Sequence, residues 1–345
     1  MSIGAIGAGL LAGCAGAPLP ATPTQARPAA LSPTLPEQPR ATEARPTAPP
    51  TPPPATSTAS PTGPVLRVDH SSIALFDSIP DAYLEAAADL SMVYIDRSVG
   101  LNISEGLDCL TAPTDEAARN HCRRTDHRSP AYSVDPAVLD WSHPGGYDRS
   151  RWVFLPWEGD CASWSDEVDC FLRMVEPIVD DFDVLSYQFS YLEVAAGSDI
   201  AAAPGGFLSD NPDRTDVFDL EAFEAAHPDK VFLYWTTSLA RGIGTVEAEQ
   251  FNDQMRLYAR SHGKPLFDVA DILSHDPSGN PCYDNRDGVA YQDENLSDDG
   301  LDLPAICPHY TTETDGGHLG SVSAGKIRVA QAFWVLMAQV AGWRP

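Results

Sequence analysis

Beyond residue 65, short apolar runs alternate with longer segments that have helical periodicity. Within each run apolar residues follow one another without alternation, which is typical of strands buried on both faces of a parallel sheet. Strand and helix repeat about five times along the chain. The pattern predicts an α/β fold, a three-layer sandwich with a five-stranded, mainly parallel sheet of the flavodoxin-like kind. The five runs cover residues 91–98, 151–157, 181–193, 230–239 and 265–273.

The N-terminus is unlike the rest of the chain. It is a short apolar run that ends in Leu11, Ala12, Gly13 and Cys14, too short to span a bilayer but suited to a signal peptide. The end of the run resembles the lipobox of bacterial lipoproteins, in which the cysteine is acylated and becomes the first mature residue. We expect a lipoprotein signal peptide over residues 1–14, with lipidation at Cys14. No lysine or arginine precedes the run, so a cleaved secretory peptide with an incidental cysteine is the alternative.

Residues 15–64 are rich in proline, threonine, alanine and serine and contain almost nothing to bury. Such a segment cannot offset its ordering entropy, and its prolines favour extended polyproline II stretches. We expect a disordered linker between the lipid anchor and a folded domain over residues 65–345.

The charge of the chain lies in the folded part. The formal net charge is −27, and residues 1–64 contain three arginines and two glutamates. A surface with this excess of carboxylates repels nucleic acid and other polyanions, and its simplest role is solubility. We expect a monomer with no nucleic-acid partner and with membrane contact through the lipid anchor only.

Six cysteines follow Cys14, and neighbouring pairs bracket short polar loops. Pairing in sequence order is the simplest prediction, although six cysteines allow fifteen pairings. Zinc binding is the competing interpretation, but no CxxC or HxxxH spacing supports it, and export favours disulfides. The predicted bonds are Cys109–Cys122, Cys161–Cys170 and Cys282–Cys307.

Three residues form a candidate catalytic set. Ser98 follows the first apolar run at a strand-to-helix turn, and ligands of such sheets bind beyond the carboxyl ends of the strands. Asp315 and His318 are separated by two glycines and precede a strongly apolar terminal helix. A serine nucleophile needs a base, and the base needs an orienting group. The plainer alternatives are a helix cap for Ser98 and loop roles for Asp315 and His318.

This arrangement resembles the SGNH (GDSL-type) hydrolase superfamily, over roughly residues 75–343. The resemblance implies the SGNH fold, with Ser98 as nucleophile, His318 as base and Asp315 as the carboxylate that supports the base. The literal Asp-Ser pair of the chain, Asp77 and Ser78, precedes the first expected strand of the sheet and is rejected.

The match departs from the family pattern in two places. Arg97 directly precedes the serine, and the third expected strand ends without the usual asparagine. The resemblance implies oxyanion donors, for which the candidates are Gly100, Gly159 and Ser190. Alternatives are Gly145 or Gly146 for Gly159, and Gln188, Tyr191 or Asn102 for Ser190. Losing one such donor costs about 10²- to 10³-fold in turnover, which puts efficient catalysis in doubt.

No metal or organic cofactor is expected. The acidic segment 283–302 fails the calcium-loop spacing, because Tyr283 stands where the first aspartate should be. We interpret Asp268, Asp271 and His275 as capping, loop or surface residues.

The resemblance implies a secreted, lipid-anchored serine esterase of the bacterial cell envelope, acting on a small-molecule or glycan ester. Trp141, Trp157 and Trp164 favour a carbohydrate ester, since sugar faces stack on aromatic rings, but loop packing explains them equally. The alternatives are an acyltransferase that uses the same residues and a catalytically inactive, glycan-binding surface lipoprotein. A periplasmic solute-binding protein would need two lobes and fits poorly.

Overall fold

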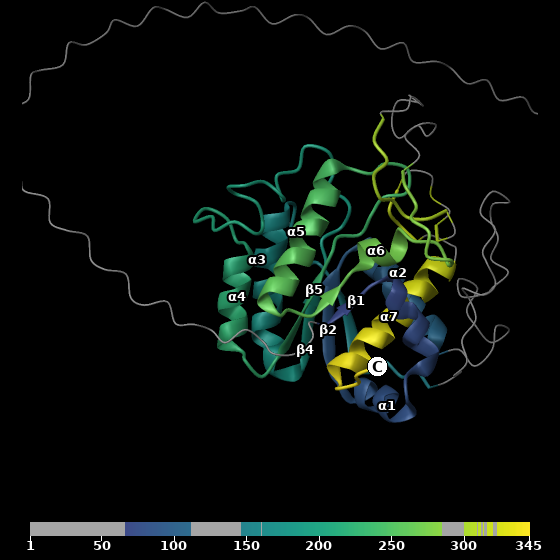
Figure 1. Ribbon diagram of the computed structural model, residues 1–345. Helices are drawn as coiled ribbons and strands as arrows, with labels where there is room; N and C mark the ends of the chain where they lie inside the picture. Colours follow the sequence, from purple (N-terminus) through teal and green to yellow (C-terminus); the bar gives the residue numbers. More distant parts are fainter. Residues whose placement is uncertain are drawn as a thin grey trace, which may run out of the picture. The chain divides into compact units, whose positions relative to one another are not determined.

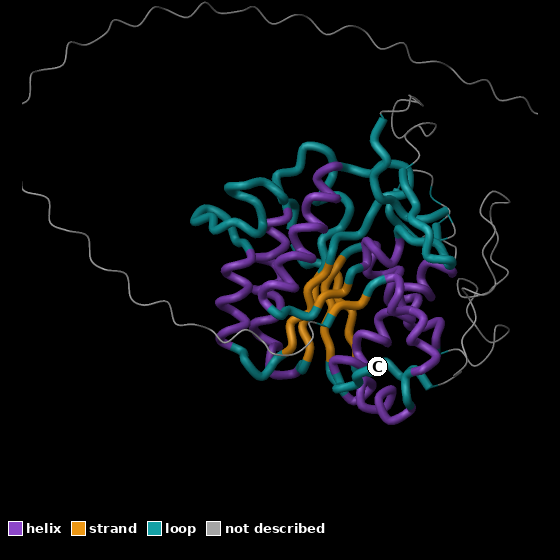
Figure 2. Tube along the Cα trace, in the orientation of Figure 1, coloured by secondary structure: helices purple, strands orange, loops and turns teal. Residues whose placement is uncertain are grey.

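One parallel β-sheet with helices on both of its faces organises the chain (Figures 1 and 2). The computed structural model describes residues 66–111, 146–159, 161–284, 300–308, 310–311, 313, 316–319 and 323–345. The predicted signal peptide, Cys14 and the linker 15–64 lie outside the described residues.

The sheet has six strands, all parallel, in the order β1-β6-β5-β4-β2-β3. The five predicted from sequence are present, and the additional one is β1, which pairs Arg67 with Leu266 and Val68 with Phe267. Two residues are too few to give a periodic signal, which is why the prediction fell one short. The strands are β1 Arg67–Val68, β2 Met92–Asp96, β3 Trp152–Pro156, β4 Val184–Tyr187, β5 Val231–Trp235 and β6 Leu266–Phe267.

The helices form the two outer layers of the sandwich. α3, α4 and α5 lie on one face of the sheet, and α1, α2, α6 and α7 on the other (Figure 1). The α-helices are α1 Asp81–Asp89, α2 Ser98–Leu110, α3 Trp164–Val175, α4 Val217–Ala226, α5 Val246–His262, α6 Val269–Leu273 and α7 Ser323–Val340, and the 3-10 helices are η1 His70–Ser78 and η4 Glu176–Asp181.

The terminal helix α7 is buried all round, because it packs against β1 of the sheet and against α2, η1, α1 and α6. Its Trp334 packs against Trp152 of β3, with the rings tilted by 40° and their centroids 4.4 Å apart. The main chain of α7 reaches α2 at Gly106, where an added Cβ would lie 2.2 Å from the Lys326 carbonyl oxygen. Only glycine allows this approach, and it fixes α7 against the helix that begins at Ser98.

The topology places a ligand crevice beside Ser98. From β2 the chain passes to β3 on one side and then crosses back to β4 on the other side of β2. At such a switch point the two connections leave the sheet in opposite directions, and a crevice opens outside the carboxyl ends of the strands. Ser98 follows β2 directly and lies at this crevice.

Two of the predicted disulfides are present, Cys161–Cys170 and Cys282–Cys307. Cys109 is also disulfide-bonded, and Cys122, its predicted partner, lies outside the described residues. Within the described part of the chain, no helix has both the length and the apolar character needed to cross a bilayer.

Candidate functional site

Ser98 and His318 meet at the carboxyl edge of the sheet. The Ser98 Oγ lies 2.7 Å from His318 Nε2, although the two residues are 220 positions apart. Ser98 is the first residue of α2, and the cap position before it belongs to Arg97. The hydroxyl therefore faces the histidine instead of capping the helix, and the helix-cap interpretation of Ser98 is wrong.

Glu313 orients His318. Its Oε1 lies 2.8 Å from His318 Nδ1, and its Oε2 accepts the backbone N–H of His318 at 2.9 Å. Thr311 Oγ1 ties the same turn together, since it accepts from Glu313 N and donates to the His318 carbonyl. Asp315, the expected supporting carboxylate, lies outside the described residues. The sequence reasoning missed Glu313 because it looked only at the D-x-x-H spacing, whereas a turn of five residues also brings a longer glutamate side chain to the imidazole.

The ionisation of this pair is coupled. The hydrogen bond that the His318 ring donates to Glu313 raises the pKa of His318 above its ordinary value, against the opposing effect of partial burial. Partial burial by itself would raise the pKa of Glu313, but its hydrogen bonds from the His318 ring and backbone lower it below its ordinary value. Glu313 is thus an anion at neutral pH that stabilises a protonated His318.

Neighbouring elements hold the His318 segment in place. Asn102, one turn into α2, accepts the backbone N–H of Leu319 at 2.9 Å. The ring of Tyr191 lies edge-on to the His318 ring, with centroids 6.0 Å apart. A Cβ on Gly317 would lie 2.1 Å from the Tyr191 ring, so the main chain passes there only as glycine. Asn102, considered an alternative oxyanion donor, has its side-chain oxygen in this contact.

A cleft of about 450 Å³ opens beside Ser98, between the start of α2 and the segment that follows β3. Its walls are largely apolar, and Leu101 is 50% exposed at its rim. The lining residues are Arg97, Ser98, Leu101, Phe154, Pro156, Trp157, Gly159, Cys161 and Ala162.

Of the three expected oxyanion donors, only Gly159 lines this cleft. It is exposed, with a backbone φ of +81° that glycine adopts readily. Gly100 is buried, and its N–H is bonded to the Asp96 carboxylate. Ser190 is also buried, and both its N–H and its hydroxyl donate to Glu193 Oε2, at 2.7 and 2.5 Å. The donors of Gly100 and Ser190 are therefore already used inside the protein.

The first turn of α2 offers other donors. The first N–H groups of a helix have no partner within the helix. Asp96 takes up two groups here, the N–H of Arg97 at 2.6 Å and that of Gly100. The N–H groups of Ser98 and Val99 have no such partner among the described residues, and Ser98 is one of the residues that line the cleft.

Three carboxyl groups are buried behind the serine: Asp96, Glu167 and Glu193. Burial raises the pKa of Asp96 to about 7, although its hydrogen bonds from Arg97 N–H and Tyr94 favour the charged form. Burial beside Glu193 raises the pKa of Glu167 to about 10. Glu167 therefore holds its proton at neutral pH and Asp96 is partly protonated, because ionised carboxylates at this depth are costly.

The three tryptophans expected to bind sugars differ in where they lie. Trp157 lines the cleft and is half-buried. Trp164 is buried at the start of α3, where its indole N–H donates to Asp199 at 2.8 Å, so it is a packing residue. Trp141 lies outside the described residues.

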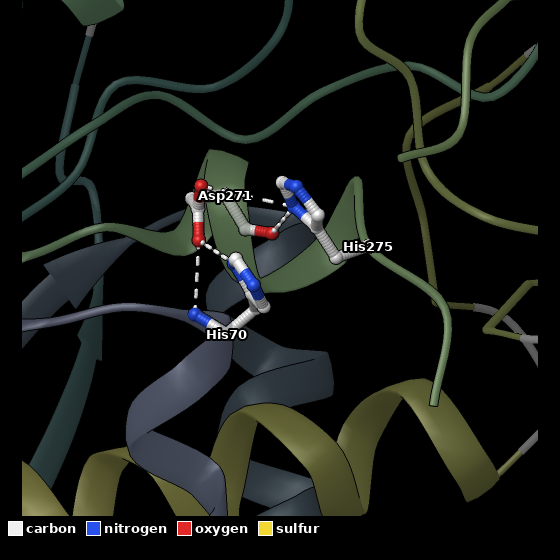
Figure 3. A group of neighbouring side chains, drawn as sticks. All are labelled: His70, Asp271 and His275. Carbon is white, nitrogen blue, oxygen red and sulfur yellow. Dashed lines mark hydrogen bonds and ion pairs between the residues drawn. The ribbon is translucent and has the colours of Figure 1, made fainter. Parts of the chain in front are cut away.

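A second group of chemistry-bearing side chains, His70, Asp271 and His275, lies at the other end of the sheet edge (Figure 3). Their possible ligand atoms lie within 4.8 Å of one another. The two rings are stacked 3.8 Å apart and nearly parallel, so their in-plane lone pairs do not converge on one point. Asp271 Oδ1 accepts from the His70 backbone and ring, and His275 Nδ1 bonds the Asp271 carbonyl. The group thereby joins η1 to α6, in keeping with the capping role expected of Asp271.

Asp268 has a structural role of the kind expected. It is fully buried after β6 and pairs with two arginines, Arg67 of β1 and Arg256 of α5, each at 2.7–2.8 Å. The pair with Arg67 fastens the short edge strand β1 to the sheet, and the pair with Arg256 fastens α5.

Comparisons of the chain with protein-family models, curated proteins and solved structures found no match. The functional assignment therefore depends on the geometry around Ser98.

Proposed function

We propose that this chain is a serine esterase in which Ser98 is the nucleophile, His318 the general base and Glu313 the residue that orients the base. The observation that carries the proposal is the unbroken line of hydrogen bonds from Ser98 Oγ to His318 Nε2 and from His318 Nδ1 to Glu313. A hydroxyl, an imidazole and a carboxylate in this order are the elements of nucleophilic acyl transfer.

The reaction would begin when His318 Nε2 takes the Ser98 proton as Oγ attacks the ester carbonyl. The oxyanion of the tetrahedral intermediate is received by the N–H groups of Ser98 and Gly159. Protonated His318 then gives its proton to the leaving alkoxide, which departs as the alcohol and leaves an acyl-Ser98. Water, deprotonated by His318, attacks the acyl group, and Ser98 recovers its proton as the acid leaves.

Fold features support the SGNH type of hydrolase. Without the edge strand β1, the remaining strands follow the flavodoxin-like order, with β2 between β3 and β4. The nucleophile follows the first strand of this set, and the base precedes the last helix, as the resemblance implies. Glu313 at the imidazole is the departure.

Several properties of the cleft bear on the substrate. Its apolar walls and half-buried Trp157 suit a compact substrate such as an acylated sugar. A glycan deacetylase of the cell envelope is consistent with the disulfides, which form in oxidising compartments. Export through a signal peptide and anchoring through Cys14 are part of this proposal.

One observation favours a second function, a glycan-binding lipoprotein that does not turn over. Among the expected oxyanion donors, those of Gly100 and Ser190 are used internally. A site with Gly159 and the first turn of α2 alone would be slower by about 10²- to 10³-fold for each missing donor.

Covalent labelling separates the two functions. The purified chain is treated with a serine-reactive fluorophosphonate, and the adduct is located by peptide mass spectrometry. We expect an adduct on Ser98 that is lost in Ser98→Ala and His318→Ala and retained in the control Ser78→Ala. A folded protein that carries no adduct at Ser98 would favour the binding lipoprotein.

A further inference from the structure

Arg97 places one positive charge in the wall of the cleft, next to the nucleophile. Its side chain is 39% exposed, and it is the only charged residue among the described residues that line the cleft. The neighbouring wall is formed by Phe154, Trp157 and Leu101, which cannot neutralise it.

Among the described residues, Glu167 on α3 is the one acidic side chain that forms an ion pair with the Arg97 guanidinium, whereas Asp96 bonds only the Arg97 backbone. The Arg97 guanidinium lies 3.5 Å from Glu167 Oε1, which is longer than a strong charge-assisted hydrogen bond. Glu167 is 1% exposed and lies against Glu193, and burial raises its pKa to about 10. Glu167 is therefore neutral at neutral pH, and its ion-pair contact with Arg97 does not cancel the positive charge of the guanidinium.

Because the rest of the molecule is strongly acidic, Arg97 offers a local binding site for an anionic group that the surrounding surface would repel. With a net charge of −27, most of the surface repels anions, so an anionic group is favoured only where a cation faces it. A guanidinium binds a carboxylate through two parallel hydrogen bonds, and apolar walls strengthen that interaction by excluding water.

We propose that Arg97 is a substrate-binding residue that recognises a carboxylate close to the scissile bond, so that the preferred substrates are esters carrying an anionic group. This inference rests on the proposed function, since it assumes that the cleft beside Ser98 holds an ester. The carboxylate can stand on the acyl side, as in a dicarboxylic hemiester, or on the alcohol side, as in an acylated acidic sugar.

The test compares anionic esters with neutral esters of the same shape. The acyl-side pair is mono-4-nitrophenyl succinate and its methyl ester; the alcohol-side pair is 4-acetoxybenzoate and its methyl ester. Rates are measured for the full chain and for the variants Arg97→Gln and Arg97→Lys. Arg173→Gln is the control, because the exposed Arg173 of α3 carries the same charge but lies outside the cleft.

We expect Arg97→Gln to lower kcat/KM for an anionic ester by about 10- to 100-fold, mainly through KM, since a hydrogen bond to a charged group is worth about 1.5–3 kcal/mol. Neutral esters should change by less than about threefold, Arg97→Lys should retain part of the preference, and Arg173→Gln should have no effect. The pair that shows the loss identifies the side on which the carboxylate lies. Equal losses on anionic and neutral esters would instead assign Arg97 to the oxyanion or to structure, and would overturn the proposal.

A binding measurement keeps this inference separate from catalysis. N-(4-nitrophenyl)succinamic acid, an amide analogue, is titrated by calorimetry into Ser98→Ala with Arg97 intact and into the double variant with Arg97→Gln. If binding of the analogue requires Arg97 but the parent chain neither labels at Ser98 nor hydrolyses any ester, carboxylate recognition is supported and the esterase proposal fails. Absence of any effect of Arg97 on both binding and rates would overturn the inference even if Ser98 labels.

Discussion

Two glutamates are each linked to Ser98 through one intervening residue, and their carboxyl groups have opposite charge states: Glu313 is ionised and Glu167 is neutral. Glu313 reaches the serine through His318, is partly exposed and has a lowered pKa. Glu167 reaches it through Arg97, is almost fully buried and has a pKa raised to about 10. Each glutamate faces a basic side chain, so the identity of the partner alone does not decide whether the carboxyl group is ionised.

The difference lies in what surrounds each carboxyl group. Glu313 accepts two close hydrogen bonds, from the His318 ring and backbone, and these favour the anion. Glu167 has one oxygen with no hydrogen-bond partner, its arginine is 3.5 Å away, and it lies beside two other acidic groups. The comparison teaches that the negative charge of this site is concentrated at the base, whereas the cleft beside the nucleophile is left positive.

The largest effect is expected when the charge of Glu313 is removed. Glu313→Gln should lower kcat/KM by about 10²- to 10⁴-fold, because a neutral amide neither stabilises protonated His318 nor fixes its tautomer. Steady-state hydrolysis of the best ester measures the loss. Asp315→Asn is the matched control and should change the rate by less than about threefold; a larger loss there than in Glu313→Gln would return the supporting role to Asp315.

Replacing the ionisable Glu167 by glutamine should change the free energy of unfolding and leave the rate of ester hydrolysis nearly unchanged. Its folded pKa is raised, so its contribution to stability is present below the ordinary pKa of 4.5 and is lost as pH rises towards about 10. Glu167→Gln removes that loss, and we expect its stability relative to the parent to rise by about 2–4 kcal/mol between pH 5 and pH 9. Urea unfolding at both pH values gives the difference. The exposed Glu176→Gln is the control, and a parallel change in both variants would contradict the assignment.

The support of the His318 segment by α2 should matter less. Asn102→Ala removes the acceptor of the Leu319 N–H and should lower kcat by about tenfold, in line with the roughly 1.4 kcal/mol worth of a single hydrogen bond. Asn102→Asp keeps the acceptor oxygen and should restore most of the rate. If both variants were equally slow, the effect would come from packing of the helix.

The smallest effect is a displacement of the pH profile. Catalysis needs neutral His318, so kcat/KM should rise with pH through the pKa of that histidine, which Glu313 raises above 6.5. In Glu313→Gln the acidic limb should move to lower pH, because the hydrogen bond that raises the pKa of His318 is weakened. The residual activity of the variant, followed from pH 5 to pH 9, measures the displacement. An unmoved limb would mean that another group controls it.

The sequence predicted the layers of the fold because the core strands are unbroken apolar runs. It missed β1, because a two-residue strand carries no periodicity and depends on pairing with β6 and on the Arg67–Asp268 ion pair. Ser98 and His318 were selected from their positions after a strand and before the last helix, and the structure places them in contact.

The remainder of the site depends on tertiary contacts that spacing does not reveal. Glu313 reaches His318 through a turn whose shape depends on Thr311, so the D-x-x-H pattern pointed to a different carboxylate. Ser190 follows β4 as expected, yet Glu193, three residues on, occupies its donors. Trp164 was expected in an exposed loop, but it is the first residue of α3 and is buried in the core.

The position of His318 just before the buried helix α7 also sets when chemistry can begin. In the proposed mechanism, Ser98 has no base until the segment 220 residues later has been made and α7 has packed against α2. The proposed nucleophile would therefore stay inert in every incomplete or unfolded form of the protein. Activity would require the finished and folded chain.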